Sequence, residues 1–220
     1  MKHNILYSFR RCPYAIRARW ALLNTNQVVE LREVDLKNKP TELIKISKKS
    51  TVPVLVTSLN QVIDESLDIM IWSLQRSNMN ILFRDANNSQ EISSLIDTND
   101  RVFKYHLDRY KYASRFNIEE SETHQDACMK ILLNLNDRLK VFSNKGKPLF
   151  LVDARESLAD WAIWPFVRQF RIADINNFDQ NNEIKYLKIW LNYFFTHHNY
   201  NLVMKKYTPW TKQNKPLFLG

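Results

Sequence analysis

The stretch RRCPYAIRARW, residues 10–20, decides how the first half of the chain is interpreted. It follows the apolar run ILYS (5–8), which predicts a β-strand, and it opens a helical pattern that continues to Leu23. Pro13 suits the first turn of a helix, because its missing N–H costs no hydrogen bond there. Cys12 is therefore predicted to cap this helix, with its sulfur beside the unpaired amides of the first turn.

Cys12 has basic neighbours in the sequence. They are Arg10, Arg11, Arg17 and Arg19. A thiol reacts as its thiolate, and both nearby cations and a helix N-terminus favour that ionised form. The alternative is a small buried hydrophobic residue, as free cysteines often are. Because arginines and a helix N-terminus suit such a residue poorly, the pattern favours a reactive Cys12, whereas Cys128 lies on an apolar helical stripe and is predicted to pack in the core.

The composition of the 220 residues excludes several classes of site. Two cysteines cannot build a disulfide framework, and the five histidines lack the spacing of a metal site, so no metal is expected. Only Gly146 and Gly220 occur, which excludes a P-loop and a G-x-G-x-x-G turn. Where the backbone needs a positive φ, we expect asparagine.

The formal net charge of +9 leaves two interpretations open. One is nucleic-acid binding, and the other is an ordinary basic surface that also attracts small anions. Because the basic residues are spread along the chain, a nucleic-acid partner is not expected. No run approaches the roughly 20 apolar residues of a membrane helix, and the N-terminal apolar stretch is too short for a signal peptide. We therefore expect a cytoplasmic protein without a membrane partner.

The chain shows two kinds of periodicity. Residues 1–76 alternate strand-like and helical runs, residues 77–90 are polar and predict a linker, and residues 91–220 are helical throughout. The predicted strands after the first are VVELREV (28–34), VPVLV (52–56) and QVID (61–64); the later helices of this half are TELIKI (41–46) and one that begins near Ser66. The predicted fold is an α/β domain followed by an all-α helical bundle.

Several motifs occur in a particular order along the chain. They are RRCPYAIRARWAL (10–22), DLKNKP (35–40), TVPVLV (51–56), DES (64–66) and SLADWAIWPF (157–166). This combination resembles the glutathione transferase superfamily, and within it the omega-like, cysteine-type branch of bacterial enzymes. The resemblance covers most of the chain and implies a thioredoxin-like N-terminal domain, glutathione as co-substrate and a homodimer.

The resemblance also implies a set of glutathione-binding residues beside the catalytic Cys12. They are Tyr14, Lys39, Val52, Pro53, Glu65 and Ser66. Pro53 is implied to be cis, so that the Val52 backbone pairs with a peptide-like ligand; the alternative is a trans proline on an edge strand. Lys39 is implied to reach the glycyl carboxylate, and otherwise it is a solvated charge.

Glu65 and Ser66 precede and begin the next predicted helix. A hydroxyl and free amides at a helix N-terminus bind a carboxylate, and a glutamate binds an ammonium group. The γ-glutamyl end of glutathione carries both groups. The alternative is an ordinary helix cap, which Ser66 alone satisfies.

The helical half carries the capping box Ser157-x-x-Asp160, which resembles the family's folding signal. Glu156 departs from the family pattern, because a hydrophobic residue is usual at that position. Pro165 lies inside the predicted helix and is expected to kink it.

Together these features predict a glutathione-dependent thiol transferase that works through a Cys12–glutathione mixed disulfide. Ala15 stands where a second redox cysteine would lie, so an internal disulfide is not available. The resemblance also implies reduction of dehydroascorbate or of small glutathione adducts, with Tyr14, Trp164 and Trp210 as candidates to line the acceptor pocket. Two alternatives remain open: conjugation of glutathione to electrophiles, and a non-enzymatic partner protein of the transcription machinery.

Overall fold

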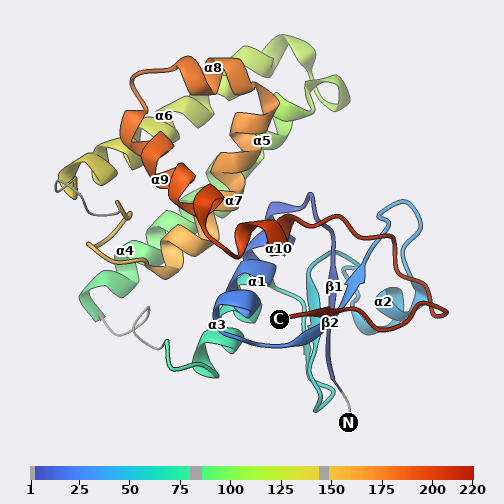
Figure 1. Cartoon of the computed structure of the whole chain (residues 1–220). Helices are drawn as coiled ribbons and strands as arrows, with labels where there is room; N and C mark the ends of the chain where they lie inside the picture. The colour runs from blue at the N-terminus through green and yellow to red at the C-terminus, as the bar shows by residue number, and fades with distance from the viewer. Residues whose placement is uncertain (1–2, 80–85, 144–148) are drawn as a thin grey trace. The chain divides into compact units, whose positions relative to one another are not determined.

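The structure is a computed structural model, and it describes residues 3–79, 86–143 and 149–220. The chain divides into two compact units (Figure 1). Unit 1 contains Met1–Ile81 together with His198–Gly220, and unit 2 contains Leu82–His197. No helix in the described ranges is both long enough and apolar enough to cross a bilayer.

Unit 1 is built on a five-stranded sheet with the order β4-β3-β1-β2-β5. The strands are β1 (Asn4–Ser8), β2 (Val29–Glu33), β3 (Val54–Val56), β4 (Val62–Ile63) and β5 (Phe218–Leu219). β1 and β2 are parallel, and the other neighbouring pairs are antiparallel. The parallel pair is joined by a helix, as a parallel connection requires.

Three helices accompany this sheet: α1 (Pro13–Asn24), α2 (Thr41–Ile46) and α3 (Ser66–Gln75). Alternate residues of β1 point to opposite faces of the sheet. On one face, Tyr7 packs with Leu43 of α2 and Val54 of β3. Leu6, which is fully buried, points to the other face. The helices α1 and α3 pack against each other and lie on the side of the sheet away from α2 (Figure 1). This α/β arrangement confirms the predicted thioredoxin-like domain.

The C-terminal segment departs from the expected division of the chain. Residues 91–220 were predicted to form the helical domain, but His198–Gly220 belongs to unit 1. Its short helix α10 (Tyr200–Met204) packs on α1, and β5 pairs with β2, aligning Leu219 with Val29. A two-residue strand carries no periodic signal, which is why the sequence did not predict it.

The predicted linker, residues 77–90, is only partly described. Residues 80–85 lie outside the described ranges, and helix α4 (Ala86–Asp97) already begins within the predicted linker. At the turns of unit 1, Asn26 and Asn60 have positive φ angles of 55° and 63°, as the scarcity of glycine predicted. Ser50 also has a positive φ, of 48°, which was not predicted.

Unit 2 is helical. After α4 it contains the π-helical turn η2 (Thr98–Phe103), α5 (Lys104–Lys111), the short 3₁₀ turns η3 (Ala113–Arg115) and η4 (Ile118–Glu120), α6 (Ser121–Val141), α7 (Leu158–Ala173), α8 (Ile175–Gln180) and α9 (Lys185–Thr196). The apolar residues Ile184, Leu187, Leu191 and Phe194, at and before α9, are buried. The buried stripe of α6 contains Cys128, Leu132, Leu135 and Leu139, whereas Ile131 is only half-buried.

The predicted capping box begins α7. The Ser157 side chain accepts from the Asp160 backbone N–H, and Asp160 accepts from the Ser157 backbone N–H. Asp160 is fully buried, and its Oδ1 also accepts from Leu151 N and from Trp190 Nε1, at 2.9 and 2.8 Å. The carboxylate therefore joins the start of α7 to α9 and to the preceding loop. Pro165 lies within α7, as predicted.

Glu156, the residue that departs from the family pattern, lies directly before this box. Burial raises the pKa of its carboxyl from 4.5 to about 7. Folding raises the pKa of this carboxyl group, so the folded protein favours its protonated form. This contribution to stability is fully present below the pKa of the unfolded state and is lost as the pH rises through the pKa of the folded state. Ionised Glu156 is therefore a source of instability above neutral pH.

We expect Glu156→Gln to stabilise the protein at pH 8 and to leave its stability nearly unchanged at pH 4. The gain at pH 8 is on the order of 2 kcal/mol, since one pKa unit corresponds to about 1.4 kcal/mol and the site is partly solvated. Urea unfolding of both proteins at the two pH values measures the difference. An equal difference in unfolding free energy at pH 4 and pH 8 would contradict this interpretation.

Candidate functional site

Cys12 occupies the position that the sequence predicted for it. Helix α1 begins at Pro13, and Cys12 is its N-cap residue, with extended backbone angles (φ −80°, ψ 121°). The Cys12 N–H donates to Phe9 O at 3.0 Å, and the Cys12 carbonyl accepts from Ile16 N at 2.9 Å. These two bonds fix the chain on both sides of a partly exposed thiol.

Val52 and Pro53 lie directly beside the thiol. The Cys12 Sγ lies 3.6 Å from the Val52 carbonyl oxygen, within hydrogen-bonding distance for sulfur. The Val52–Pro53 peptide bond is cis, as the resemblance implied. Val52 is buried, and its carbonyl oxygen makes the contact with the Cys12 sulfur. The structure thus brings together two predicted residues that are 40 positions apart in the chain, Cys12 and Val52, with Pro53 next to Val52.

The start of α3 is tied to α1 by a contact that the sequence did not predict. Ser66 is buried, and its Oγ accepts from Arg17 Nε at 3.0 Å. Because Arg17 supplies the donor, the Ser66 hydroxyl proton is available to bind a carboxylate. From the sequence, Arg17 was expected beside Cys12, and the structure places its guanidinium against Ser66 at the N-terminus of α3. Only the pairing of α1 with α3 reveals this role.

Glu65, the residue before α3, forms an ion pair with Lys49. More than half of each side chain is exposed, at 57% and 56%. An exposed pair of this kind contributes little to stability, typically below about 1 kcal/mol. Glu65 thus pairs with the ammonium group of Lys49, and its binding of a ligand ammonium group stays a prediction.

Two further predicted residues have less defined surroundings. Tyr14 lies in the first turn of α1, with the Arg17 guanidinium 4.9 Å from its ring centre. Lys39 is half-buried in the turn that precedes α2. The described contacts do not join Lys39 to Cys12, so its role stays a prediction.

Arg19 is not one of the cations beside the thiol. It is fully buried and forms an ion pair with Glu33 at the end of β2, so its charge is compensated there. Burial lowers the pKa of the Arg19 guanidinium, and Glu33 opposes that shift. Of the four arginines expected around Cys12, Arg19 therefore has its charge compensated by Glu33.

The candidate acceptor-pocket tryptophans lie elsewhere. Trp164 is completely buried in unit 2, where it stacks on Phe194 with ring centres 5.4 Å apart. A side chain without exposed surface cannot line an open pocket, so that suggestion is wrong. Trp210 belongs to the C-terminal segment of unit 1, where the Arg32 guanidinium lies 4.1 Å from its ring centre.

Cys128 behaves as predicted. It is fully buried in α6, and burial raises the pKa of its thiol to about 12. In the ranges 3–79, 86–143 and 149–220, three or more His, Cys, Asp or Glu side chains do not converge on a metal-sized position.

The two cysteines therefore predict a clear difference in reactivity. We expect iodoacetamide at pH 7.5 to modify Cys12 and to leave Cys128 unmodified in the folded protein, because only Cys12 is accessible and only its thiol lies at a helix N-terminus. Peptide mapping by mass spectrometry after a short exposure measures both sites. Modification of Cys128 at a comparable rate would show that this description of the two thiols is wrong.

Comparison with known proteins identifies the fold. Residues 6–79 match the family model of the glutathione S-transferase N-terminal domain. The chain has the glutathione S-transferase fold. The match includes Cys12 and Val52, which are in contact, and also Pro53 and Ser66, so these residues belong to the region that defines this domain.

Comparisons that cover most of the chain agree with this fold. Glutathione S-transferase L2, chloroplastic, from Arabidopsis thaliana is 29% identical over 192 residues; the match covers 84% of this chain and 61% of that protein, so the chain spans less than two thirds of its relative. A tau-class glutathione S-transferase from mango superposes with a TM-score of 0.77, at 24% identity and 94% coverage of each chain. Glutathione transferase Omega 3C from Trametes versicolor superposes with a TM-score of 0.76, at 18% identity, covering 95% of this chain and 92% of that one. These findings support the superfamily without distinguishing a class within it.

Proposed function

We propose that this glutathione S-transferase-like protein is a thiol transferase of the cysteine-type, omega-like branch, which forms a mixed disulfide between Cys12 and glutathione. The observation that carries the proposal is the 3.6 Å contact between Cys12 Sγ and the Val52 carbonyl oxygen. It places a thiol where the backbone presents hydrogen-bonding groups to a peptide-like ligand. A hydroxyl at this position can only bind a thiolate, whereas a thiol can exchange with a disulfide.

The reaction has two exchange steps. In the first, the Cys12 thiolate attacks the glutathione sulfur of a mixed disulfide; the S–S bond breaks, Cys12–S–SG forms, and the substrate thiolate leaves and takes up a proton. In the second, the thiolate of another glutathione attacks the glutathionyl sulfur. Oxidised glutathione is released, and Cys12 leaves as a thiolate. With Ala15 at the position of a second cysteine, the resolving thiol comes from glutathione.

The two ends of glutathione have suitable partners in unit 1. The Ser66 hydroxyl and the α3 N-terminus bind the γ-glutamyl carboxylate, with the Arg17 charge directly behind Ser66. Glu65 binds the ammonium group in place of Lys49. Val52 pairs with the central part of the tripeptide, and Lys39 binds the glycyl carboxylate. Tyr14, in the first turn of α1, borders the acceptor.

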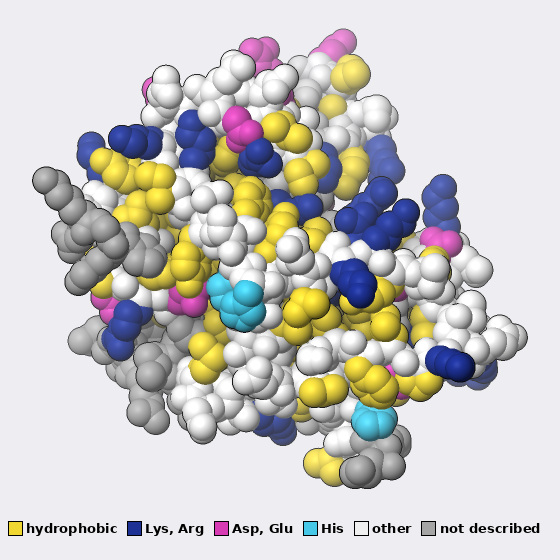
Figure 2. Space-filling view, in the orientation of Figure 1, with side chains coloured by type: hydrophobic (Ala, Val, Ile, Leu, Met, Phe, Trp, Pro, Cys, Tyr) yellow, Lys and Arg dark blue, Asp and Glu magenta, His cyan; other side chains and the backbone are white. Residues whose placement is uncertain are grey.

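We propose that the protein acts as a homodimer in the cytoplasm. Its substrates are small or protein disulfides, and its reactions include reductions of the dehydroascorbate type. We do not propose a nucleic-acid partner. On the face in Figure 2, lysine and arginine side chains are interspersed with hydrophobic and other side chains, which suits small anionic ligands better than a continuous polyanion.

Variants of the two cysteines test the reaction. We expect Cys12→Ser to slow the glutathione-dependent reduction of a glutathionylated peptide by on the order of 100-fold, because the nucleophile is lost. The matched variant Cys128→Ala removes the buried thiol and should retain the rate within about twofold. Coupled assay of oxidised glutathione measures exchange, and 1-chloro-2,4-dinitrobenzene measures conjugation in the same samples.

The outcome separates the alternatives. If disulfide exchange survives in Cys12→Ser while conjugation falls, the protein is a conjugating transferase and the proposed mechanism is wrong. If the wild-type protein neither performs exchange nor binds to immobilised glutathione, the non-enzymatic partner protein becomes the better interpretation.

A further inference from the structure

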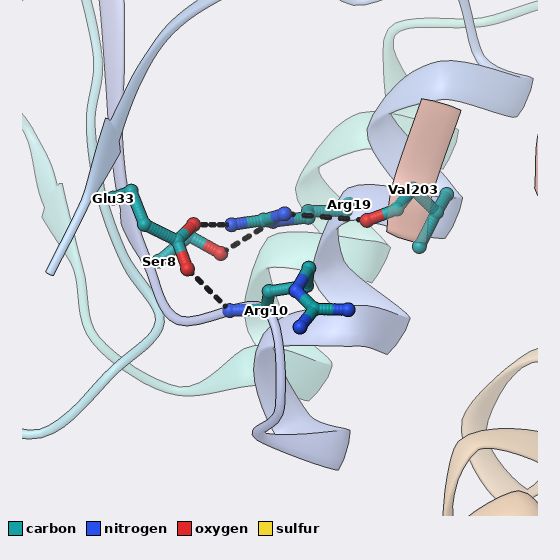
Figure 3. A network of polar contacts seen from close by, with 5 residues as sticks. All are labelled: Ser8, Arg10, Arg19, Glu33 and Val203. Carbon is teal, nitrogen blue, oxygen red and sulfur yellow. Dashed lines mark hydrogen bonds and ion pairs between the residues drawn. The ribbon is translucent and has the colours of Figure 1, made fainter. Parts of the chain in front are cut away.

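A buried polar network lies behind the loop that carries Cys12 (Figure 3). Its centre is the ion pair between Arg19 of α1 and Glu33 at the end of β2. The Arg19 side chain is fully buried and that of Glu33 is 8% exposed. Arg19 Nε also donates to Ser8 Oγ at 2.7 Å. The pair therefore joins β1, β2 and α1 in the interior of unit 1.

Glu33 contacts the chain on both sides of Cys12. Its Oε1 accepts from the backbone N–H of Arg10 at 2.8 Å, two residues before the thiol. Its Oε2 accepts from Arg19, which lies on the helix that begins directly after the thiol. Figure 3 shows the carboxylate between these two donors. A single side chain thus fixes both the loop that enters the site and the helix that leaves it.

The same pair also holds the C-terminal segment. Arg19 Nη1 donates to the backbone carbonyl oxygen of Val203 at 3.2 Å. The backbone N–H of Trp210 donates to the backbone carbonyl oxygen of Glu33 at 2.7 Å. Tyr207 lies between these two residues in the chain. Burial raises the pKa of its hydroxyl, and the nearby Arg19 charge opposes that shift. Residues 203–210 are therefore part of the network that supports the thiol loop.

We propose that Glu33 is a positioning residue for Cys12, and that residues 203–210 complete the support through Arg19. The consequence for turnover rests on the proposed thiol-transferase function, but the effect on thiol reactivity does not. Without the carboxylate, the Arg10 N–H loses its acceptor and the Arg19 charge is left buried without its partner. The loop then shifts the sulfur relative to Val52 and to the α1 amides. Displacements of about 1 Å can slow reactions by a factor on the order of 100.

The main variant is Glu33→Gln, made in a Cys128→Ala background so that Cys12 is the reporting thiol. A glutamine side chain has an NH₂ group in place of one carboxylate oxygen, so Arg10 N and Arg19 Nη2, which now donate to two separate oxygens of Glu33, no longer each have an acceptor of their own. The negative charge that compensates Arg19 is also lost. We expect the rate of Cys12 alkylation by iodoacetamide at pH 7 to fall about tenfold, and the rate of mixed-disulfide formation with oxidised glutathione to fall by a similar factor. Affinity for S-methylglutathione, which does not use the thiol, should stay within about twofold.

The matched control is Glu30→Gln on the same strand. Glu30 accepts from Arg32 Nε at 2.8 Å and belongs to a somewhat less buried ion pair, with side chains 13% and 16% exposed, and the described contacts of its carboxylate do not include the Arg10 loop. We expect its thiol rates to match those of the background protein. Should Glu33→Gln fail to fold, Ser8→Ala removes the acceptor of Arg19 Nε and leaves the ion pair in place; we expect it to slow alkylation about two- to threefold.

The possible results are distinct. If Glu33→Gln is less stable but its folded form is alkylated at the background rate, Glu33 has only a structural role and the proposal is wrong. Equal slowing by Glu30→Gln would also overturn it, because the effect would then be unspecific. If the background protein does not react with oxidised glutathione, the thiol-transferase function fails, while the alkylation rates still decide the role of Glu33.

Discussion

The ion pair between Arg19 and Glu33 is the interaction on which the organisation of unit 1 depends. It lies in the interior and joins β1, β2, α1 and the C-terminal segment. Removing one partner of such a pair leaves an uncompensated buried charge, which typically costs about 3–5 kcal/mol. Once one of these two charges is buried in the fold, the other is therefore needed to compensate it. It also explains why a segment more than 160 residues distant along the chain returns to the sheet that carries Cys12.

The candidate site is assembled from elements that this framework holds in place. Cys12 comes from the start of α1, Val52 and Pro53 precede β3, and Ser66 begins α3. Each of these places offers backbone groups or a helix N-terminus, so the site binds mainly through groups whose positions the fold determines. Arg17 adds the charge that links α1 to α3. The chemical identity of the site, in contrast, depends on one atom, because a sulfur at position 12 permits disulfide exchange and a hydroxyl oxygen does not.

Local patterns were sufficient to predict much of this structure. The start of α1, the start of α3 and the α7 capping box follow from proline, serine and aspartate at positions where helices need them. Contacts between distant segments were beyond the sequence. Arg17 and Arg19 look alike on α1, yet one binds Ser66 and the other Glu33, and only the tertiary packing separates them. For the same reason the pairing of β5 with β2, and the Asn136 side chain of α6 that accepts from the first amides of α9, were not predicted.

We propose that Cys12 exchanges with a glutathione disulfide because its thiol lies at the N-terminus of α1, beside the backbone groups that bind the tripeptide. Intact-mass and peptide-mass spectra after brief exposure to oxidised glutathione at pH 7 test it directly. The account predicts a single glutathionyl group, located on Cys12, which reduced glutathione then removes. An unmodified protein, or one that carries the group on Cys128, would contradict it.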